Sequence, residues 1–219
     1  FGDVGVDGSL LKGCAAEACP DDSIIELANG CICCTVADDF LPAMAALLAR
    51  PLPPDHIIIE TSGLALPQPL IRAFGWPDIA SRVTVDAVVT VVDGKAQAEG
   101  RYADDEATIQ AMRAADPNLE HENPIGELFA DQLNCADLVV LNKTDLMSEA
   151  EIAAVSAELS QRKRGSTSLV RAAEGKVPLD VLIGRSAAAE ADIRNRPPTH
   201  ELEGEERHDH ADFVRFHVD

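Results

Sequence analysis

Three runs of aliphatic residues without polar alternation constrain the fold of this chain most strongly. They are HIIIE at His56–Glu60, AVVTVVD at Ala87–Asp93 and DLVVLNK at Asp137–Lys143, with TSLVRA at Thr167–Ala172 as a weaker fourth. Runs of this kind are typical of parallel strands in a sheet that is covered on both faces. Because 46% of the residues are hydrophobic and only 4% are aromatic, the core around these strands must be aliphatic.

Helical patterns separate the strand-like runs. They cover Asp38–Arg50, Pro67–Phe74, Asp104–Ala115, Pro124–Cys135, Ser148–Arg164 and Pro178–Glu190. Strands that alternate with helices form βαβ units. The sequence therefore predicts an α/β fold with a doubly wound, mostly parallel sheet.

The two ends of the chain predict a division into parts. We expect the α/β domain at residues 1–194, an acidic linker containing histidine and proline at 195–211, and the first strand of a further α+β domain at 212–219. The opening residues FGDVGVDG follow no strand-like run. We therefore expect a fragment whose first strand lies upstream of Phe1.

Charge and cysteine content narrow the class of partner. The formal net charge is −20, and a surface of this sign attracts cations but repels phosphate backbones and anionic lipid, which argues against nucleic acid and membranes. No apolar run reaches the roughly 20 residues of a membrane-spanning helix. Six cysteines, with Cys33 beside Cys34, indicate a reducing, cytoplasmic protein rather than a disulfide scaffold.

The strongest chemical motif is VVLNKTD, which places Asn142, Lys143 and Asp145 at the end of an apolar strand. Guanine presents N1–H and an exocyclic amine as paired donors, which one carboxylate accepts and which adenine does not offer. The Asn side chain can tie neighbouring loops together, and the Lys stem can lie over the purine ring. The alternative is a polar strand end that merely opens a loop. The position between a strand and a helix favours guanine recognition.

A second motif, HIIIETSGLA, ends a strand-like run in the acid Glu60, followed closely by Gly63. In phosphate-binding α/β folds, an acid at this position holds Mg²⁺ directly or through water. A glycine just beyond allows its backbone N–H to approach a terminal phosphate. The alternative is an acid that leaves the core before a helix cap.

Three cysteines, Cys31, Cys33 and Cys34, cluster in NGCICC. Thiolates suit zinc and other soft or borderline metals, and three of them leave a coordination position open, which fits a metal carrier better than a closed structural site. An extended segment would point Cys34 away from the other two, so convergence needs a turn. The alternative is that these residues are small buried hydrophobes.

The other candidate metal ligands are weaker. Cys14 and Cys19 could join the cysteine cluster or line a loop, and His208 and His210 lie in the acidic linker. Cys135 ends a predicted helix beside a strand and reads as a core residue.

Together these motifs resemble the CobW family of GTPases, which is in the same class as the hydrogenase and urease nickel-insertion GTPases. The segments FGDVGVDG, GCICC, IIIETSGLALPQPLIRAF, VTVVD and ADLVVLNKTDL follow the family pattern in order, and the resemblance as a whole covers nearly the whole chain. The segment HENPIGELFADQLNCADLVVLNKTD looks closest to the cobalamin-biosynthesis branch. The family's Gly-x-x-Gly-x-Gly-Lys-Thr phosphate loop does not occur in these residues.

The resemblance implies a set of site residues. It implies a metal site of the Cys-x-Cys-Cys type at Cys31, Cys33 and Cys34, with Glu60 as the magnesium-binding acid and Gly63 as the phosphate-sensing glycine. It also implies guanine readout by Asn142, Lys143 and Asp145, with Ala172 and Ala173 as candidates for a further contact with the base. Asp3 would lie near nucleotide or metal. Without the phosphate loop, we expect these residues alone to hydrolyse no GTP.

The resulting hypothesis is a GTP-dependent metallochaperone that uses GTP, GDP and Mg²⁺ and carries Co²⁺ for cobalamin biosynthesis. Its client would be a cobaltochelatase, and a nucleotide- or metal-dependent homodimer is compatible with it. One alternative is a zinc chaperone of the same family, because Zn²⁺ often outcompetes Co²⁺ at thiolate sites. Another is a regulatory GTP-binding switch with a structural metal site.

Overall fold

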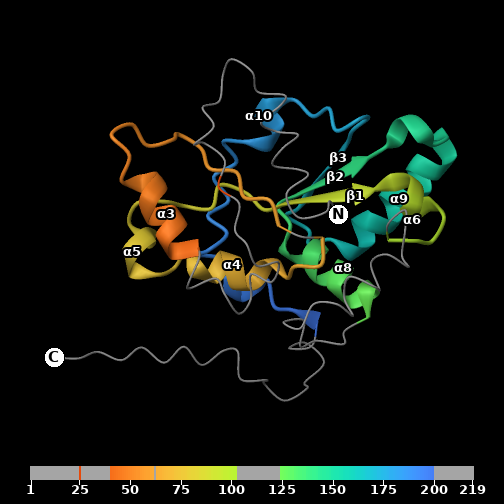
Figure 1. The fold of residues 1–219 in the computed structure, drawn as a ribbon. Coiled ribbons are helices and arrows are strands. Elements are labelled where there is room, and N and C mark those ends of the chain that lie inside the picture. The colour runs from red at the N-terminus through yellow and green to blue at the C-terminus, as the bar shows by residue number, and fades with distance from the viewer. Residues whose placement is uncertain (1–24, 26–39, 62, 103–123, 200–219) are drawn as a thin grey trace.

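The structure is a computed structural model, and it describes residues 25, 40–61, 63–102 and 124–199. Its central element is a parallel sheet of three strands. The strands are β1 (Val89–Asp93), β2 (Leu138–Asn142) and β3 (Ser168–Arg171), in the order β1-β2-β3 (Figure 1). The register sets Asp93 opposite Asn142 and Leu141 opposite Arg171. The predicted α/β class and parallel sheet are confirmed for these strands.

Helices precede, connect and follow the strands. They are α3 (Leu41–Leu48), α4 (Pro67–Ala73), α5 (Pro77–Ala80), α6 (Gly94–Ala98), α8 (Ile125–Cys135), α9 (Glu149–Arg162) and α10 (Leu179–Leu182), with 3₁₀ turns η3 (Thr144–Leu146) and η4 (Ile193–Asn195). The patterns above predict neither α5 nor α6, which are short. The predicted helix at 104–115 lies outside the described residues. None of the helices that the structure describes is both long and apolar enough to cross a membrane.

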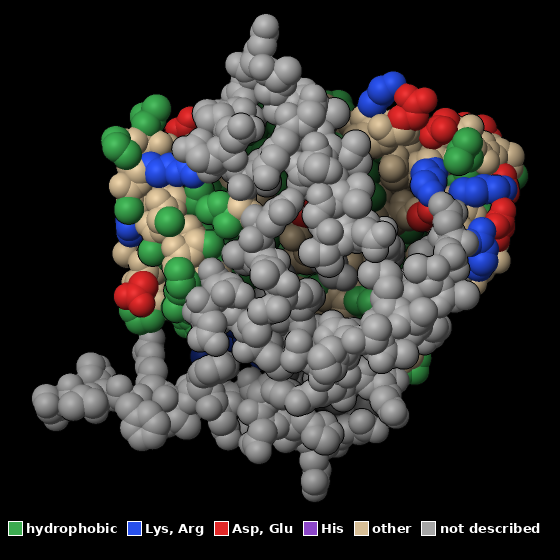
Figure 2. Space-filling model, in the orientation of Figure 1, with side chains coloured by type: hydrophobic (Ala, Val, Ile, Leu, Met, Phe, Trp, Pro, Cys, Tyr) green, Lys and Arg blue, Asp and Glu red, His purple; other side chains and the backbone are tan. Residues whose placement is uncertain are grey.

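One face of the sheet is covered by α8 and α9. The α9 helix begins with a capping box, in which Ser148 Oγ accepts the Glu151 N–H at 3.3 Å and Glu151 Oε2 accepts the Ser148 N–H at 2.7 Å. The capping box fixes where α9 begins, and the apolar side chains of α9 pack on the sheet. The buried layer consists of Val92, Phe129, Leu133, Ala136, Val139, Leu141, Ile152, Val155 and Leu159. Charged side chains of both signs gather outside it, over α6 and α9 (Figure 2).

The opposite face is covered over β2 and β3 but open over β1. Leu138 and Val140 pack with Val181 and Leu182 of the α10 region. On β1, Val91 is 64% exposed, although it lies opposite the buried Val140 in the register. The doubly wound arrangement is therefore present only in part within the described residues.

The prediction of a strand at residues 56–60 was wrong. Ile58 is 85% exposed, and this segment forms no ladder with any described strand. An apolar run is buried as a strand only when neighbouring strands bond to its N–H and C=O groups and helices cover its faces. The pattern of aliphatic residues alone does not show whether those neighbours are in place.

The predicted helix at residues 178–190 was too long, because α10 ends at Leu182. Gly184, Ser186 and Ala188 all have positive φ, which a right-handed helix does not allow. Asp86 fixes this path by accepting the N–H groups of Gly184 and Ser186, both at 2.6 Å. The Ser186 hydrogen bond is the main reason why the pKa of Asp86 is lowered from its usual range.

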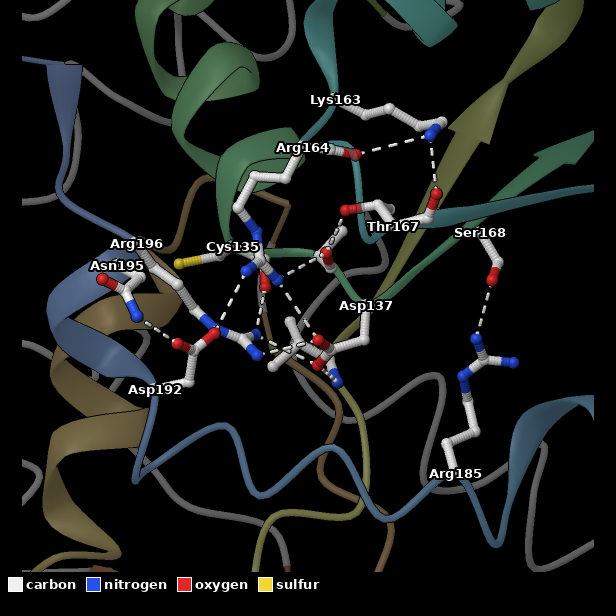
Figure 3. A network of polar contacts seen from close by, with 12 residues as sticks. Cys135, Asp137, Lys163, Arg164, Thr167, Ser168, Arg185, Asp192, Asn195 and Arg196 are labelled. Carbon is white, nitrogen blue, oxygen red and sulfur yellow. Dashed lines mark hydrogen bonds and ion pairs between the residues drawn. The ribbon is translucent and has the colours of Figure 1, made fainter.

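The start of the predicted linker is anchored to the domain. Arg196 is only 1% exposed, and its two Nη atoms donate to both carboxylate oxygens of Asp137, at 3.0 and 2.7 Å (Figure 3). Its Nη1 also donates to the Cys135 carbonyl at 2.6 Å. The Thr199 N–H donates to Asp131 at 2.6 Å. Residues 196–199 therefore pack on the sheet domain, and the division after residue 194 stays a prediction.

Candidate functional site

The polar ends of β1 and β2 meet at the carboxyl edge of the sheet. The last residues of these strands, Asp93 and Asn142, are paired in the register. The chain leaves β3 after Arg171 and enters a turn at the same edge. In open α/β sheets, ligands bind outside this edge, so the residues that follow each strand are the candidates for a site.

Asn142 holds the turn that follows β3. Its Oδ1 accepts the Gly175 N–H at 2.9 Å. Ala173 and Lys176 form an isolated bridge, and both residues between them have positive φ, 52° at Glu174 and 71° at Gly175. Two successive positive φ values define a tight hairpin turn of type I′. The side chain of Asn142 therefore ties two loops together, as the motif predicts.

Thr144 makes a second connection between the same loops. Its N–H and its Oγ1 both donate to the Ala172 carbonyl, at 3.1 and 2.7 Å. The Ala172 N–H in turn donates to the Leu141 carbonyl at 2.8 Å. Ala172 is buried and both of its backbone groups are engaged, so it positions the loop, and Ala173 is the better candidate for contact with a ligand.

Lys143 begins the turn that follows β2. Its φ is 59°, in the left-handed region, which costs a non-glycine residue about 1–2 kcal/mol. Lys143 is the residue directly before the η3 turn, on which Asp145 is exposed. The residues Asn142, Lys143 and Asp145 therefore follow one another closely at the end of β2, and the contacts of Asn142 and Thr144 join this turn to the loop after β3.

Asp93 is a member of this cluster that the sequence patterns did not identify. Its Oδ2 lies 2.6 Å from Lys143 Nζ, and its Oδ1 accepts the Ala96 N–H at 3.0 Å, which caps α6. Burial acts to raise the pKa of the Asp93 carboxyl, but the bonds from Lys143 and Ala96 outweigh it, so the pKa is lowered overall. The sequence signal that could have identified Asp93 is an acid at the end of a strand-like run, directly before a glycine.

Glu60 and Gly63 lie on a separate segment. Glu60 is exposed, which leaves its carboxylate accessible to a cation. Gln132 of α8 donates through Nε2 to the carbonyls of Gly63 and Ala65, at 2.8 and 3.1 Å. Residues 63–65 are therefore tied to α8, and this contact was not predicted.

Most of the predicted metal ligands fall outside the described residues: Asp3, Cys14, Cys19, Cys31, Cys33, Cys34, His208 and His210. Cys135 is buried, as predicted, and burial raises the pKa of its thiol to about 12. A thiol in this state is a poor metal ligand, because the thiolate is the binding form. Within the described ranges, no three His, Cys, Asp or Glu side chains are grouped to hold a metal ion.

A parallel sheet with an Asn-Lys-x-Asp turn at its carboxyl edge defines an α/β domain of the nucleotide-binding class. The profile of the CobW/HypB/UreG nucleotide-binding domain matches residues 1–171. The chain belongs to this family, which confirms the resemblance noted in its motifs.

The names of three relatives contain the word zinc. The chain is 59% identical over 221 residues to "Zinc chaperone CobW" of a Sinorhizobium species, covering 100% of this chain and 62% of the relative. It is 48% identical over 222 residues to the Pseudomonas aeruginosa protein of the same name, covering 100% and 59%. "Zinc chaperone YeiR" of Escherichia coli is 27% identical over 179 residues, covering 81% and 45%. No solved structure matches.

The chain thus spans about six-tenths of the length of the first two relatives. Their names favour the zinc alternative over the cobalt and cobalamin assignment that the sequence segments indicated. Nothing in the names mentions cobalt or a cobaltochelatase.

Proposed function

We propose that this chain carries the nucleotide-binding part of a GTP-dependent zinc chaperone. The observation that carries the proposal is the loop pair at the carboxyl edge, where Asn142 and Thr144 hold the turn after β3 beside the exposed Asp145. Such a pair leaves a carboxylate, an aliphatic stem and backbone groups available to one planar ligand. Membership in a nucleotide-binding family supports a purine nucleotide as that ligand.

Guanine recognition follows from the donors and acceptors at this edge. Asp145 would accept the guanine N1–H and the exocyclic amine, which adenine lacks in this arrangement. The stem of Lys143 would lie against the purine ring, while Asn142 keeps the loop of Ala172 and Ala173 in place. Because the loops are already bonded to each other, little conformational entropy is lost when the base binds.

The phosphate side of the site involves the segment that begins at Glu60. A carboxylate is the oxygen ligand that Mg²⁺ prefers, and the exposed Glu60 fits that role, with Asp3 as a second candidate. Bound Mg²⁺ would neutralise charge that develops on the phosphates. The Gly63 N–H would contact the terminal phosphate, and the Gln132 bonds would hold this segment in position.

Zinc is the cargo in this proposal, and Cys31, Cys33 and Cys34 are its candidate ligands. Three thiolates with one open position suit tetrahedral Zn²⁺ that must later be released. GTP would order the cysteine segment so that zinc binds, and hydrolysis would loosen it so that zinc passes to a client. A cytoplasmic location and a nucleotide- or metal-dependent homodimer remain predictions.

Nucleotide selectivity tests the guanine part of the proposal. We expect the whole protein to bind GDP at least roughly 100-fold more tightly than ADP, because a bound base covers the polar groups that read it, and the wrong base leaves them without a partner. Isothermal titration with GDP, ADP and Mg²⁺ measures both affinities. Equal affinity for the two nucleotides would contradict the assignment of the site.

A further inference from the structure

We propose that Asp93 is a positioning residue for guanine recognition, which acts by holding Lys143 against the end of β1. The inference rests on the proposed function, because it concerns the same base site. It assigns a role to a side chain outside the Asn-Lys-x-Asp motif, on a different strand and 50 residues earlier in the chain.

The two oxygens of Asp93 have separate partners. Oδ2 pairs with Lys143 Nζ at 2.6 Å, and Oδ1 accepts the Ala96 N–H at 3.0 Å. The side chain of Asp93 is 18% exposed and that of Lys143 is 36% exposed, so the pair is partly shielded from water. One carboxylate therefore caps α6 and holds the lysine at the same time.

Gly94 allows α6 to begin directly against the end of β2. A Cβ at this position would lie 2.8 Å from the Asn142 carbonyl oxygen, 2.6 Å from Met147 Sδ and 2.9 Å from Leu141 Cδ1. The backbone oxygen cannot move without disturbing the strand end that carries the motif. Only glycine therefore permits the approach that brings Asp93 within reach of Lys143.

Helix α6, which Asp93 caps, is held in place by side-chain contacts with α9. Lys95 of α6 pairs with Glu151 of α9 at 3.2 Å, and Gln97 Nε2 donates to Glu158 of the same helix at 3.1 Å. Since α9 packs on the sheet, the carboxylate of Asp93 has a fixed place relative to β2. It can therefore resist displacement of Lys143.

The ion pair determines which part of Lys143 is offered to a base. With its ammonium group bonded to Asp93, Lys143 can offer only its aliphatic stem to a base, and 36% of its side chain is exposed. If the Asp93 carboxylate lost its charge, the ammonium group of Lys143 would turn toward solvent. The aliphatic stem of Lys143 and the turn that carries Asp145 would then be held less firmly.

The substitution Asp93→Asn separates the two roles of this residue. Asparagine is an equally good N-cap, so its oxygen still accepts the Ala96 N–H, but the charge that holds Lys143 is lost. In the whole protein we expect GDP affinity to fall about tenfold. We expect the melting temperature to fall by less than about 4 °C. The control Glu99→Gln removes another ion-paired acid of the α6 region, paired with Lys95 and Arg101, and should leave GDP affinity unchanged.

A double-mutant cycle with Lys143→Ala shows whether Asp93 acts through the lysine. GDP affinity is measured for the wild type, both single variants and the double variant by titration into the millimolar range. We expect Asp93→Asn to have no further effect when Lys143 is already alanine. Unchanged GDP affinity in Asp93→Asn, or a loss that simply adds in the double variant, would overturn the inference. A wild type that does not prefer GDP to ADP would instead overturn the proposed function.

Discussion

Replacing Arg196 with alanine should destabilise the protein by about 3–5 kcal/mol, because it leaves a carboxylate without its main cation in a largely buried position. Asp137 would lose both of its contacts with Arg196, and the Cys135 carbonyl would lose a donor. The remaining partners of Asp137 are the Val88 N–H at 2.9 Å and Arg164 at 3.2 Å. The second arginine limits the loss but does not replace a bidentate pair.

Urea unfolding of the wild type and the variant measures this effect. The matched control is Arg171→Ala, since Arg171 is also paired with an acid but its side chain is 54% exposed and that of its partner Glu149 is 88% exposed. Exposed pairs contribute about 0–1 kcal/mol, so the control should unfold almost as the wild type does. A loss below about 1 kcal/mol in Arg196→Ala would show that water readily replaces the arginine and that the network does not anchor residues 196–199.

Asp145→Asn should weaken GDP binding by about 2–5 kcal/mol and shift preference to xanthosine diphosphate. Asparagine offers one acceptor and one donor where aspartate offers two acceptors. Guanine presents two donors to this position, whereas xanthine presents the N1–H and a carbonyl oxygen. The substitution therefore mismatches guanine and matches xanthine.

Titration of both nucleotides into the wild type and the variant tests the exchange. Glu149→Gln is the control, because Glu149 is exposed in the first turn of α9, close to Asp145 in sequence. The control should keep its preference for GDP. An Asp145→Asn variant that still binds GDP as the wild type does would remove the guanine assignment.

The strands were predictable from sequence where the chain itself supplies their neighbours. Val139 and Leu141 lie in an apolar run, and the run forms β2 because β1 and β3 flank it. The equally apolar run at 56–60 forms no strand, since no described strand pairs with it. Burial of Cys135 was also predictable, because it ends a helix beside β2.

The base site was predictable only in its contiguous part. Asn142, Lys143 and Asp145 form one short motif, and their place at a strand end follows from the preceding apolar run. The partners Asp93 and Gly175 come from other strands and loops, so their roles depend on register and turn geometry that no local pattern contains. The end of α10 was missed for the same reason, because Asp86 fixes that path from nearly 100 residues away.

In the proposed function, nucleotide state controls zinc affinity, and Zn²⁺ titration of the whole protein measures this control. Zinc affinity is measured with a non-hydrolysable GTP analogue and with GDP, in the wild type and in a variant with Cys31, Cys33 and Cys34 all changed to serine. Cys135→Ser serves as the control, since this buried thiol is a poor ligand. We expect roughly 5–150-fold tighter zinc binding with the GTP analogue than with GDP, and we expect this difference to be lost in the triple variant and kept in the control. Equal zinc affinity in the two nucleotide states would rule out a nucleotide-controlled zinc carrier and would favour a regulatory switch with a structural metal site.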